Sequence, residues 1–259
     1  MRWALADSWT ITRRDLLRRG RQPGMLLIEL AFPIMMVLMF GFLLGGAITV
    51  PGGGNYLDFL LPGMFAMTMF FGAEATMAAV TGDKTKGVTD RFRSMPMAPS
   101  AVVAGRSGAD LINSVAGLVV MIGTGLLVGW RWHNGSWPAL AAVGLLLLLR
   151  FALIWLGIYL GLLAEAPESI MALQILVWPV GFLSTVFVAP ATMPGWLGTI
   201  ASWNPLSATV TACRELFGNP VADASWPGRH SLLLAVLWPI ALNVLFGVLS
   251  VRRYQRLSR

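Results

Sequence analysis

Six long apolar runs most strongly limit what this 259-residue chain can fold into. A run of about 20 apolar residues is the length that an α-helix needs to cross the hydrocarbon of a bilayer. Hydrophobic residues make up 56% of the chain and charged residues 12%, so there are too few charges to cover this apolar surface in water. We predict an all-α integral membrane protein with six transmembrane helices in a single domain, residues 1–259. The predicted spans are 25–48, 57–80, 107–129, 139–163, 169–188 and 228–251.

The basic residues predict how the spans are oriented. Lys and Arg number 19 against 12 Asp and Glu, and most of these cations fall in the N-terminal segment, the loop 82–106 and the C-terminal tail. Cytoplasmic segments of membrane proteins carry an excess of Lys and Arg. We therefore expect both termini and the loop on the cytoplasmic side. The Arg-rich, Lys-poor composition is associated with bacteria, which indicates the bacterial plasma (inner) membrane, and the placement of the cations gives no reason to expect nucleic acid.

Residues 1–22 are predicted to form an interfacial helix that leads into the first span. One helical face carries residues at suitable spacing: Leu5, Trp9, Thr12 and Leu16. A twin-arginine export signal is the alternative, because Arg13-Arg14 stands in a similar context. The apolar run that follows is longer than the roughly 7–15 residues of a signal core, which favours the interfacial helix.

Motifs for catalysis or metal binding are missing from the sequence. His133, His230 and the single Cys213 are too few for a metal site or a disulfide. Gly82 and Gly87 have the glycine spacing of a phosphate-binding loop, but Val88 stands where that loop requires Lys. We therefore expect no enzyme activity and no cofactor on this chain.

The loop 82–106 contains a candidate short helix with basic and apolar residues together. Prolines limit its C-terminal extent. Lys84, Lys86, Arg91 and Arg93 surround Val88, Phe92 and Met95. Two interpretations stay open on composition alone: a solvated basic loop that only enforces topology, and a contact surface for another protein.

This loop resembles the cytoplasmic loop of type-2 ATP-binding-cassette exporter permeases, especially the daunorubicin-resistance group. The resemblance is carried by Asp83-Lys84, Gly87, Asp90-Arg91-Phe92-Arg93, Pro96 and Gly105-Arg106. The resemblance implies a coupling helix that docks on a separate ATPase subunit, where ATP and Mg would bind. It also implies a second permease copy or a homologous permease as partner. The docking role is carried over to Asp83, Gly87, Asp90, Arg91, Phe92, Arg93 and Pro96.

The outer segment 191–227 is too long and too rich in Trp and Pro for a simple loop. We predict two short amphipathic helices, Met193–Trp203 and Leu206–Phe217, which are interrupted at Asn204-Pro205. The resemblance implies that they re-enter the outer leaflet. The alternative is an ordinary amphipathic surface segment.

Two ionisable residues inside the spans are candidates for a translocation path. Arg150 lies near the middle of its span and Glu74 lies in the second span. Ionisable residues at membrane depth usually face a cavity or a partner. Arg150 has two open interpretations, a structural ion pair and a path residue, and its candidate partners are Asp110, Glu74 or a water-filled crevice.

The resemblance and the topology together predict the permease subunit of an ATP-driven exporter. Its substrate would be hydrophobic or amphipathic, such as a drug, a lipid or a glycoconjugate, as in multidrug efflux and antibiotic resistance. A secondary, ion-coupled multidrug transporter is the alternative, but it would need ionisable relays in the membrane, for which few residues qualify. A membrane-embedded enzyme would need polar catalytic groups that the sequence does not show.

Overall fold

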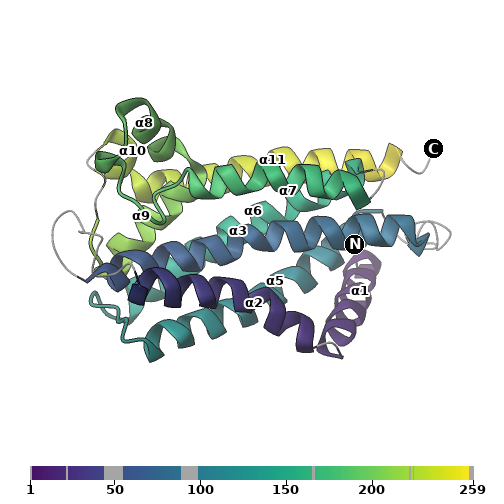
Figure 1. Ribbon diagram of the computed structural model, residues 1–259. Helices are drawn as coiled ribbons and strands as arrows, with labels where there is room; N and C mark the ends of the chain where they lie inside the picture. The colour runs from purple at the N-terminus through teal and green to yellow at the C-terminus, as the bar shows by residue number, and fades with distance from the viewer. Residues whose placement is uncertain are drawn as a thin grey trace.

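The computed structural model describes residues 2–21, 23–43, 55–88, 99–164, 167–221, 223 and 225–256. Over these ranges the chain forms helices and no strand, which confirms the prediction of an all-α protein. The long helices run side by side in one bundle (Figure 1). The helices are α1 Arg2–Gly20, α2 Pro23–Leu38, the π-helix η1 Met39–Leu43, α3 Tyr56–Thr85, α5 Pro99–Leu127, α6 Ser136–Leu163, α7 Pro167–Phe182, the 3₁₀ turn η2 Pro190–Thr192, α8 Gly195–Trp203, α9 Pro205–Phe217, α10 Trp226–Arg229 and α11 Ser231–Arg256.

Among the residues that the structure describes, four helices are long and apolar enough to cross a membrane. They are α3, α5, α6 and α11, over Tyr56–Thr85, Val102–Leu127, Ser136–Leu163 and Ser231–Gln255. The apolar part of α2 and η1 is shorter, and α7 has 16 residues. Both run beside the long helices (Figure 1). Four spans are therefore supported by helix length and composition, and the six-span topology stays a prediction.

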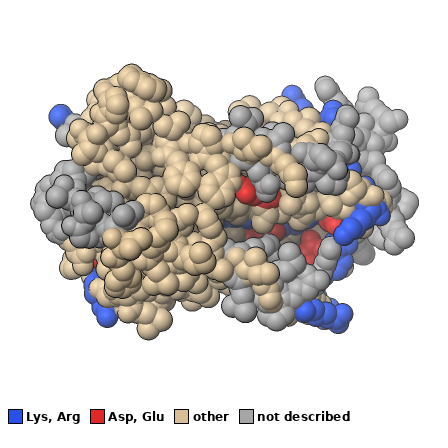
Figure 2. All heavy atoms as spheres, in the orientation of Figure 1, with Lys and Arg blue, Asp and Glu red and all other residues tan. Residues whose placement is uncertain are grey.

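Much of the outer surface of the bundle is apolar, as expected of a protein in lipid. Leu237 and Val244 of α11 are 50% and 65% exposed, and Val119 of α5 is 63% exposed. Apolar side chains exposed over such an extent need a non-aqueous neighbour. In Figure 2 the middle of the molecule shows few charged atoms, while Lys and Arg lie at the ends, with more of them at the end that carries α1.

The helices that flank the predicted loop 82–106 are longer than the sequence predicted. α3 continues to Thr85 and α5 begins at Pro99, so both ends of this loop are helical. Two side chains of α3 hold its extension against the end of α6. Thr81 Oγ1 donates to Gly161 O at 3.1 Å and Lys84 Nζ donates to Ala164 O at 2.8 Å. Lys84 thus neutralises a helix C-terminus rather than standing in solvent.

The helix predicted for 169–188 ends earlier, at Phe182. Pro179 lies inside its last turn, and residues 183–188 follow as bends and turns. The amide of Asn204 donates to Val180 O and Leu183 O, both at 2.8 Å. These bonds satisfy carbonyls that have no partner within the helix, so the helix can end there. The predicted last span, 228–251, is also shifted, because α10 ends at Arg229 and α11 continues to Arg256.

α3 lies at the centre of the bundle and packs most extensively on α6. Gly157 and Gly161 allow this approach, because an added Cβ would lie 2.8 Å from Ala73 O or Met77 O of α3. Close backbone approach through small residues spaced by four is the usual way for helices to pack in lipid. The pair Gly157 and Gly161 therefore marks the close contact of α6 with α3.

α1 lies across the end of the bundle, near the junction of α3 and α5 and both chain ends (Figure 1). It packs on α5 where Thr12 Oγ1 donates to Gly105 O at 2.7 Å and Ile11 is buried. α1 is a helix over Arg2–Gly20, and its interfacial role stays a prediction; of the predicted face, Thr12 is buried and Trp9 is 62% exposed. Gly105 of α5 allows the close contact with α1, because an added Cβ at Gly105 would meet Ser8 O. α1 therefore packs on α5 through the side that carries Ser8 and Ile11.

Candidate functional site

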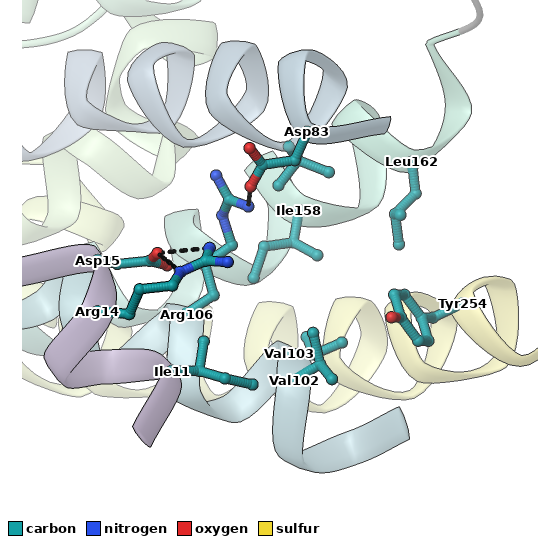
Figure 3. Close-up of a pocket in the computed structure, with 11 residues that line it drawn as sticks. Ile11, Arg14, Asp15, Asp83, Val102, Val103, Arg106, Ile158, Leu162 and Tyr254 are labelled. Atoms are coloured by element: carbon teal, nitrogen blue, oxygen red, sulfur yellow. Dashed lines mark hydrogen bonds and ion pairs between the residues drawn. The ribbon is translucent and has the colours of Figure 1, made fainter. Parts of the chain in front are cut away.

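An ion pair joins the two helices that lead into and out of the loop. Arg106 Nη1 of α5 lies 2.6 Å from Asp83 Oδ2 of α3, and both side chains are largely buried. Figure 3 shows this pair at a small pocket where α1, α3, α5, α6 and α11 meet. Ile158 and Tyr254 belong to the apolar cluster at this end of the bundle, so the pair is shielded from water on that side.

A second group of polar contacts lies one turn further along α5, toward its middle. Arg106, Asp110 and Ser114 follow at intervals of four residues and therefore share one helical face. Thr76 Oγ1 of α3 donates to Asp110 Oδ2 at 2.8 Å. Ser114 Oγ donates to Asp110 O at 2.7 Å.

Arg150 of α6 completes this series at membrane depth. Its Nε donates to Ser114 Oγ at 2.6 Å and its Nη2 donates to Thr76 Oγ1 at 3.0 Å. The side chain is 2% exposed. We call the six residues the polar ladder: Asp83, Arg106, Thr76, Asp110, Ser114 and Arg150. Arg150 thus reaches the predicted partner Asp110 through a threonine hydroxyl.

A cavity of about 280 Å³ opens beside Arg150 and Ser114, at the end of the polar ladder away from the loop. Arg150, Ser114 and Glu74 line one part of it, and Phe32, Phe71 and Trp178 line another. The three aromatic rings contact one another, with centroids 4.9 to 5.8 Å apart. Figure 2 shows acidic atoms in a recess of this face of the bundle. The cavity therefore offers apolar ring surface beside one cation and one carboxylate, which suits an amphipathic molecule.

The two predicted path residues therefore lie in one cavity. Arg150 donates to the hydroxyls of Thr76 and Ser114 and also lines the cavity, and both interpretations of this residue, the structural ion pair and the path residue, stay open. The passage of a substrate through this cavity stays a prediction.

The predicted docking residues are only partly visible. Asp90, Arg91, Phe92, Arg93 and Pro96 lie outside the described residues. Asp83 is 7% exposed and bonded to Arg106, so it holds the base of the loop. Gly87 has φ +67°, a left-handed conformation that glycine adopts without strain, and it follows the last turn of α3.

The outer segment forms the two helices that were predicted, and they meet at Asn204-Pro205. Asn204 Oδ1 accepts from Leu206 N at 2.9 Å and so caps α9, while Pro205 occupies the first turn. With α10, these helices gather at the end of the bundle away from α1 (Figure 1). Entry into the outer leaflet stays a prediction.

Arg214 is the residue whose importance the sequence analysis missed. It is 2% exposed, and it donates to Phe59 O at 2.8 Å and to Val186 O at 3.0 Å. Its guanidinium carbon lies 3.5 Å from the ring centroid of Phe59. Burial lowers the pKa of Arg214 to about 9, so the group still carries its charge at neutral pH. Arg214 fastens α9 to α3.

A signal for this burial was present in the sequence. Val210, Arg214 and Phe217 are spaced by four and three residues, so they share one face of α9. Val210 and Phe217 are both buried, as is the neighbouring Cys213, which is a free cysteine. An arginine within an apolar helical face predicts a buried anchor.

Exchanging the charges of the Asp83–Arg106 pair tests its role at the base of the loop. We expect Asp83→Arg and Arg106→Asp each to lower thermal stability and transport, because each places two like charges in a shielded site. The double variant should regain most of the loss, since it restores an ion pair. The measurements are the unfolding temperature and the transport into membrane vesicles for the unchanged protein, the two single variants and the double variant. A double variant no better than the single ones would contradict it.

Comparison with known proteins identifies the family. The family model described as ABC-2 type transporter matches residues 7–217. The chain therefore belongs to the ABC-2 type transporter family.

Several curated relatives are similar over almost the whole chain. The daunorubicin resistance ABC transporter permease protein DrrB1 of Streptomyces coeruleorubidus is 34% identical, over 97% of this chain and 88% of the relative. The probable doxorubicin resistance ABC transporter permease protein DrrC of Mycobacterium tuberculosis is 22% identical, over 98% of this chain and 90% of the relative. The putative transport permease ycf38 of Cyanophora paradoxa is 24% identical, over 88% and 78%.

Proposed function

We propose that this chain is the membrane-spanning permease subunit of an exporter that is driven by ATP hydrolysis on a separate subunit. The family match over residues 7–217 carries the proposal. Similarity to relatives that are named as ABC transporter permeases supports it. The chain would have six spans in the bacterial plasma membrane with both termini in the cytoplasm, and its substrate would be hydrophobic or amphipathic.

The ATPase subunit would dock on the loop between α3 and α5. The loop carries the Asp90-Arg91-Phe92-Arg93 motif. The sequence shows no phosphate-binding motif for ATP hydrolysis, so the proposal assigns this reaction to a separate subunit. A second permease copy, or a homologous permease, would complete the transporter. ATP and Mg would bind to the ATPase subunits.

The cavity beside Arg150 would be part of the substrate path. Its aromatic and charged lining supports an amphipathic substrate, and its volume is near the lower end of the range for small-molecule sites. The polar ladder supports a mechanical link, because the Asp83–Arg106 pair at the base of the loop and the hydrogen-bonded group that reaches the cavity lie one turn apart on the same face of α5. Movement of the loop by the ATPase would then reshape the cavity.

Charging the apolar centre of the loop tests the docking proposal. We expect Phe92→Asp, and separately the removal of both Arg91 and Arg93, to abolish ATPase association and transport without loss of membrane insertion. The reason is that an interface core tolerates an unpaired charge poorly. The measurement is co-purification of the proposed ATPase subunit with the tagged chain.

Trp137→Asp is a matched control for this experiment. Trp137 is 82% exposed and lies at the start of α6, at the other end of the bundle, and the change adds the same charge. Normal recovery of the ATPase with Phe92→Asp, or equal loss with Trp137→Asp, would refute docking at the loop.

A further inference from the structure

The exposed side of α1 carries a regular pattern that the packing of the bundle does not use. Trp9, Arg13, Leu17 and Arg21 follow one another at intervals of four residues, the last just beyond the helix end. Trp9 and Leu17 are 62% and 55% exposed, and both arginines are exposed. We call these four residues the α1 stripe.

The α1 stripe lies roughly opposite the face that holds α1 on α5. Residues of a helix advance by about 100° each, since a turn contains 3.6 residues. Ser8, Ile11 and Thr12 form the packed face, and the α1 stripe is centred on the other side of the helical wheel. Packing on α5 therefore presents two cations and two large apolar side chains outward together.

The position of α1 in the bundle gives its depth. Arg14 and Asp15 of α1 line the same small pocket as the Asp83–Arg106 pair, near the end of α3 and the start of α5 (Figure 3). α1 lies across the ends of the long helices, and the apolar helix α2 begins at Pro23, directly after it (Figure 1). This is the level of the lipid headgroups for a bundle whose middle lies in hydrocarbon.

We propose that the α1 stripe binds the phosphates of anionic phospholipids in the leaflet on that side of the membrane. The indole ring of Trp9 favours the headgroup region, and Leu17, between the two arginines, reaches the acyl boundary. The two arginines lie about 12 Å apart along the helix, from 1.5 Å per residue, so they contact separate phosphates. The α1 stripe contains no acid, whereas Arg14, beside it, is already paired with Asp15 at 2.7 Å. The proposal rests on the membrane location and not on export or on an ATPase.

Spin-labelled lipids test the proposal on the full-length chain in phosphatidylcholine bilayers. The measured quantity is the association constant of spin-labelled phosphatidylglycerol relative to spin-labelled phosphatidylcholine. We expect a clear preference for phosphatidylglycerol. The preference should fall at least about fivefold in the Arg13→Gln/Arg21→Gln variant, because about fivefold is the effect of losing even one cation near an anionic surface. The matched control is Arg14→Gln/Arg252→Gln, which removes the same charge and should keep the preference. Absence of a preference in the unchanged protein, or an equal fall in the control, would overturn the proposal.

A label on the α1 stripe separates lipid from a protein partner. Cys213 is buried and is replaced by Ala, and Leu17→Cys then takes a fluorescent label. We expect lipids that carry a quencher below the headgroup to quench the label, with or without the ATPase subunit. A label that these lipids leave unquenched, and that the ATPase subunit covers, would show that this face binds the ATPase and would overturn the proposal.

Discussion

Arg150→Met is expected to abolish transport and to lower the free energy of unfolding by about 3–5 kcal/mol, the usual cost of removing one partner from a buried ionic network. Arg150 is 2% exposed, and its guanidinium donates to Ser114 of α5 and Thr76 of α3. Methionine fills similar space but leaves the Asp110 carboxylate without the cation that shares Thr76. The three helices would lose their common polar contact.

Two further variants separate the charge of Arg150 from its hydrogen bonds. Thr76→Val removes hydrogen bonds only, and single hydrogen bonds between membrane helices average about 0.6 kcal/mol, so stability should fall much less. Arg150→Lys keeps the charge but cannot place two donors in the fork geometry of arginine. We expect it to recover part of the stability and little of the transport.

The measurements are unfolding in mixed micelles and uptake into inverted membrane vesicles, with the amount of inserted protein as reference. An Arg150→Met protein with unchanged stability and unchanged uptake would show that neither interpretation of this residue holds.

The second large effect is expected at the contact between α3 and α6. Ala at Gly157 and Gly161 would place each new Cβ 2.8 Å from a backbone carbonyl of α3, at Ala73 and Met77. Backbone cannot move aside as a flexible side chain can, so the helices must separate. Overpacking of this kind costs about 1–3 kcal/mol per site. Because Thr76 lies between these contacts, the Gly157→Ala/Gly161→Ala variant should also weaken the polar ladder and reduce transport.

Gly144 provides a control on the same helix. No atom lies within 4 Å of the position of a Cβ at Gly144, so Gly144→Ala should leave the unfolding free energy and transport nearly unchanged. The comparison uses unfolding in mixed micelles. Equal stability of the double variant and the control would mean that α3 and α6 do not approach as closely as the structure places them.

Features of the fold that depend on local pattern could be predicted from the sequence. Apolar length located the helices, because only a helix satisfies its own backbone in hydrocarbon. The interruption at Asn204-Pro205 could be predicted, because asparagine caps helices and proline lacks the backbone N–H donor that a continuing helix needs.

Features that depend on tertiary partners could not be predicted. The extension of α3 to Thr85 depends on carbonyls of α6 that accept from Thr81 and Lys84. The early end of α7 depends on the amide of Asn204. The link from Arg150 to Asp110 passes through Thr76, a residue type that occurs throughout membrane helices. Hydropathy carries no information on which side chains of separate helices meet.

ATP-dependent uptake of a fluorescent amphipathic probe into inverted vesicles tests the central claim most directly. Vesicles contain this chain alone, the proposed ATPase subunit alone, or both. Each preparation is energised in turn by ATP with the proton gradient collapsed and by a proton gradient without ATP. We predict uptake only with both proteins and ATP. Uptake by this chain alone in response to the proton gradient would contradict the account and identify a secondary transporter.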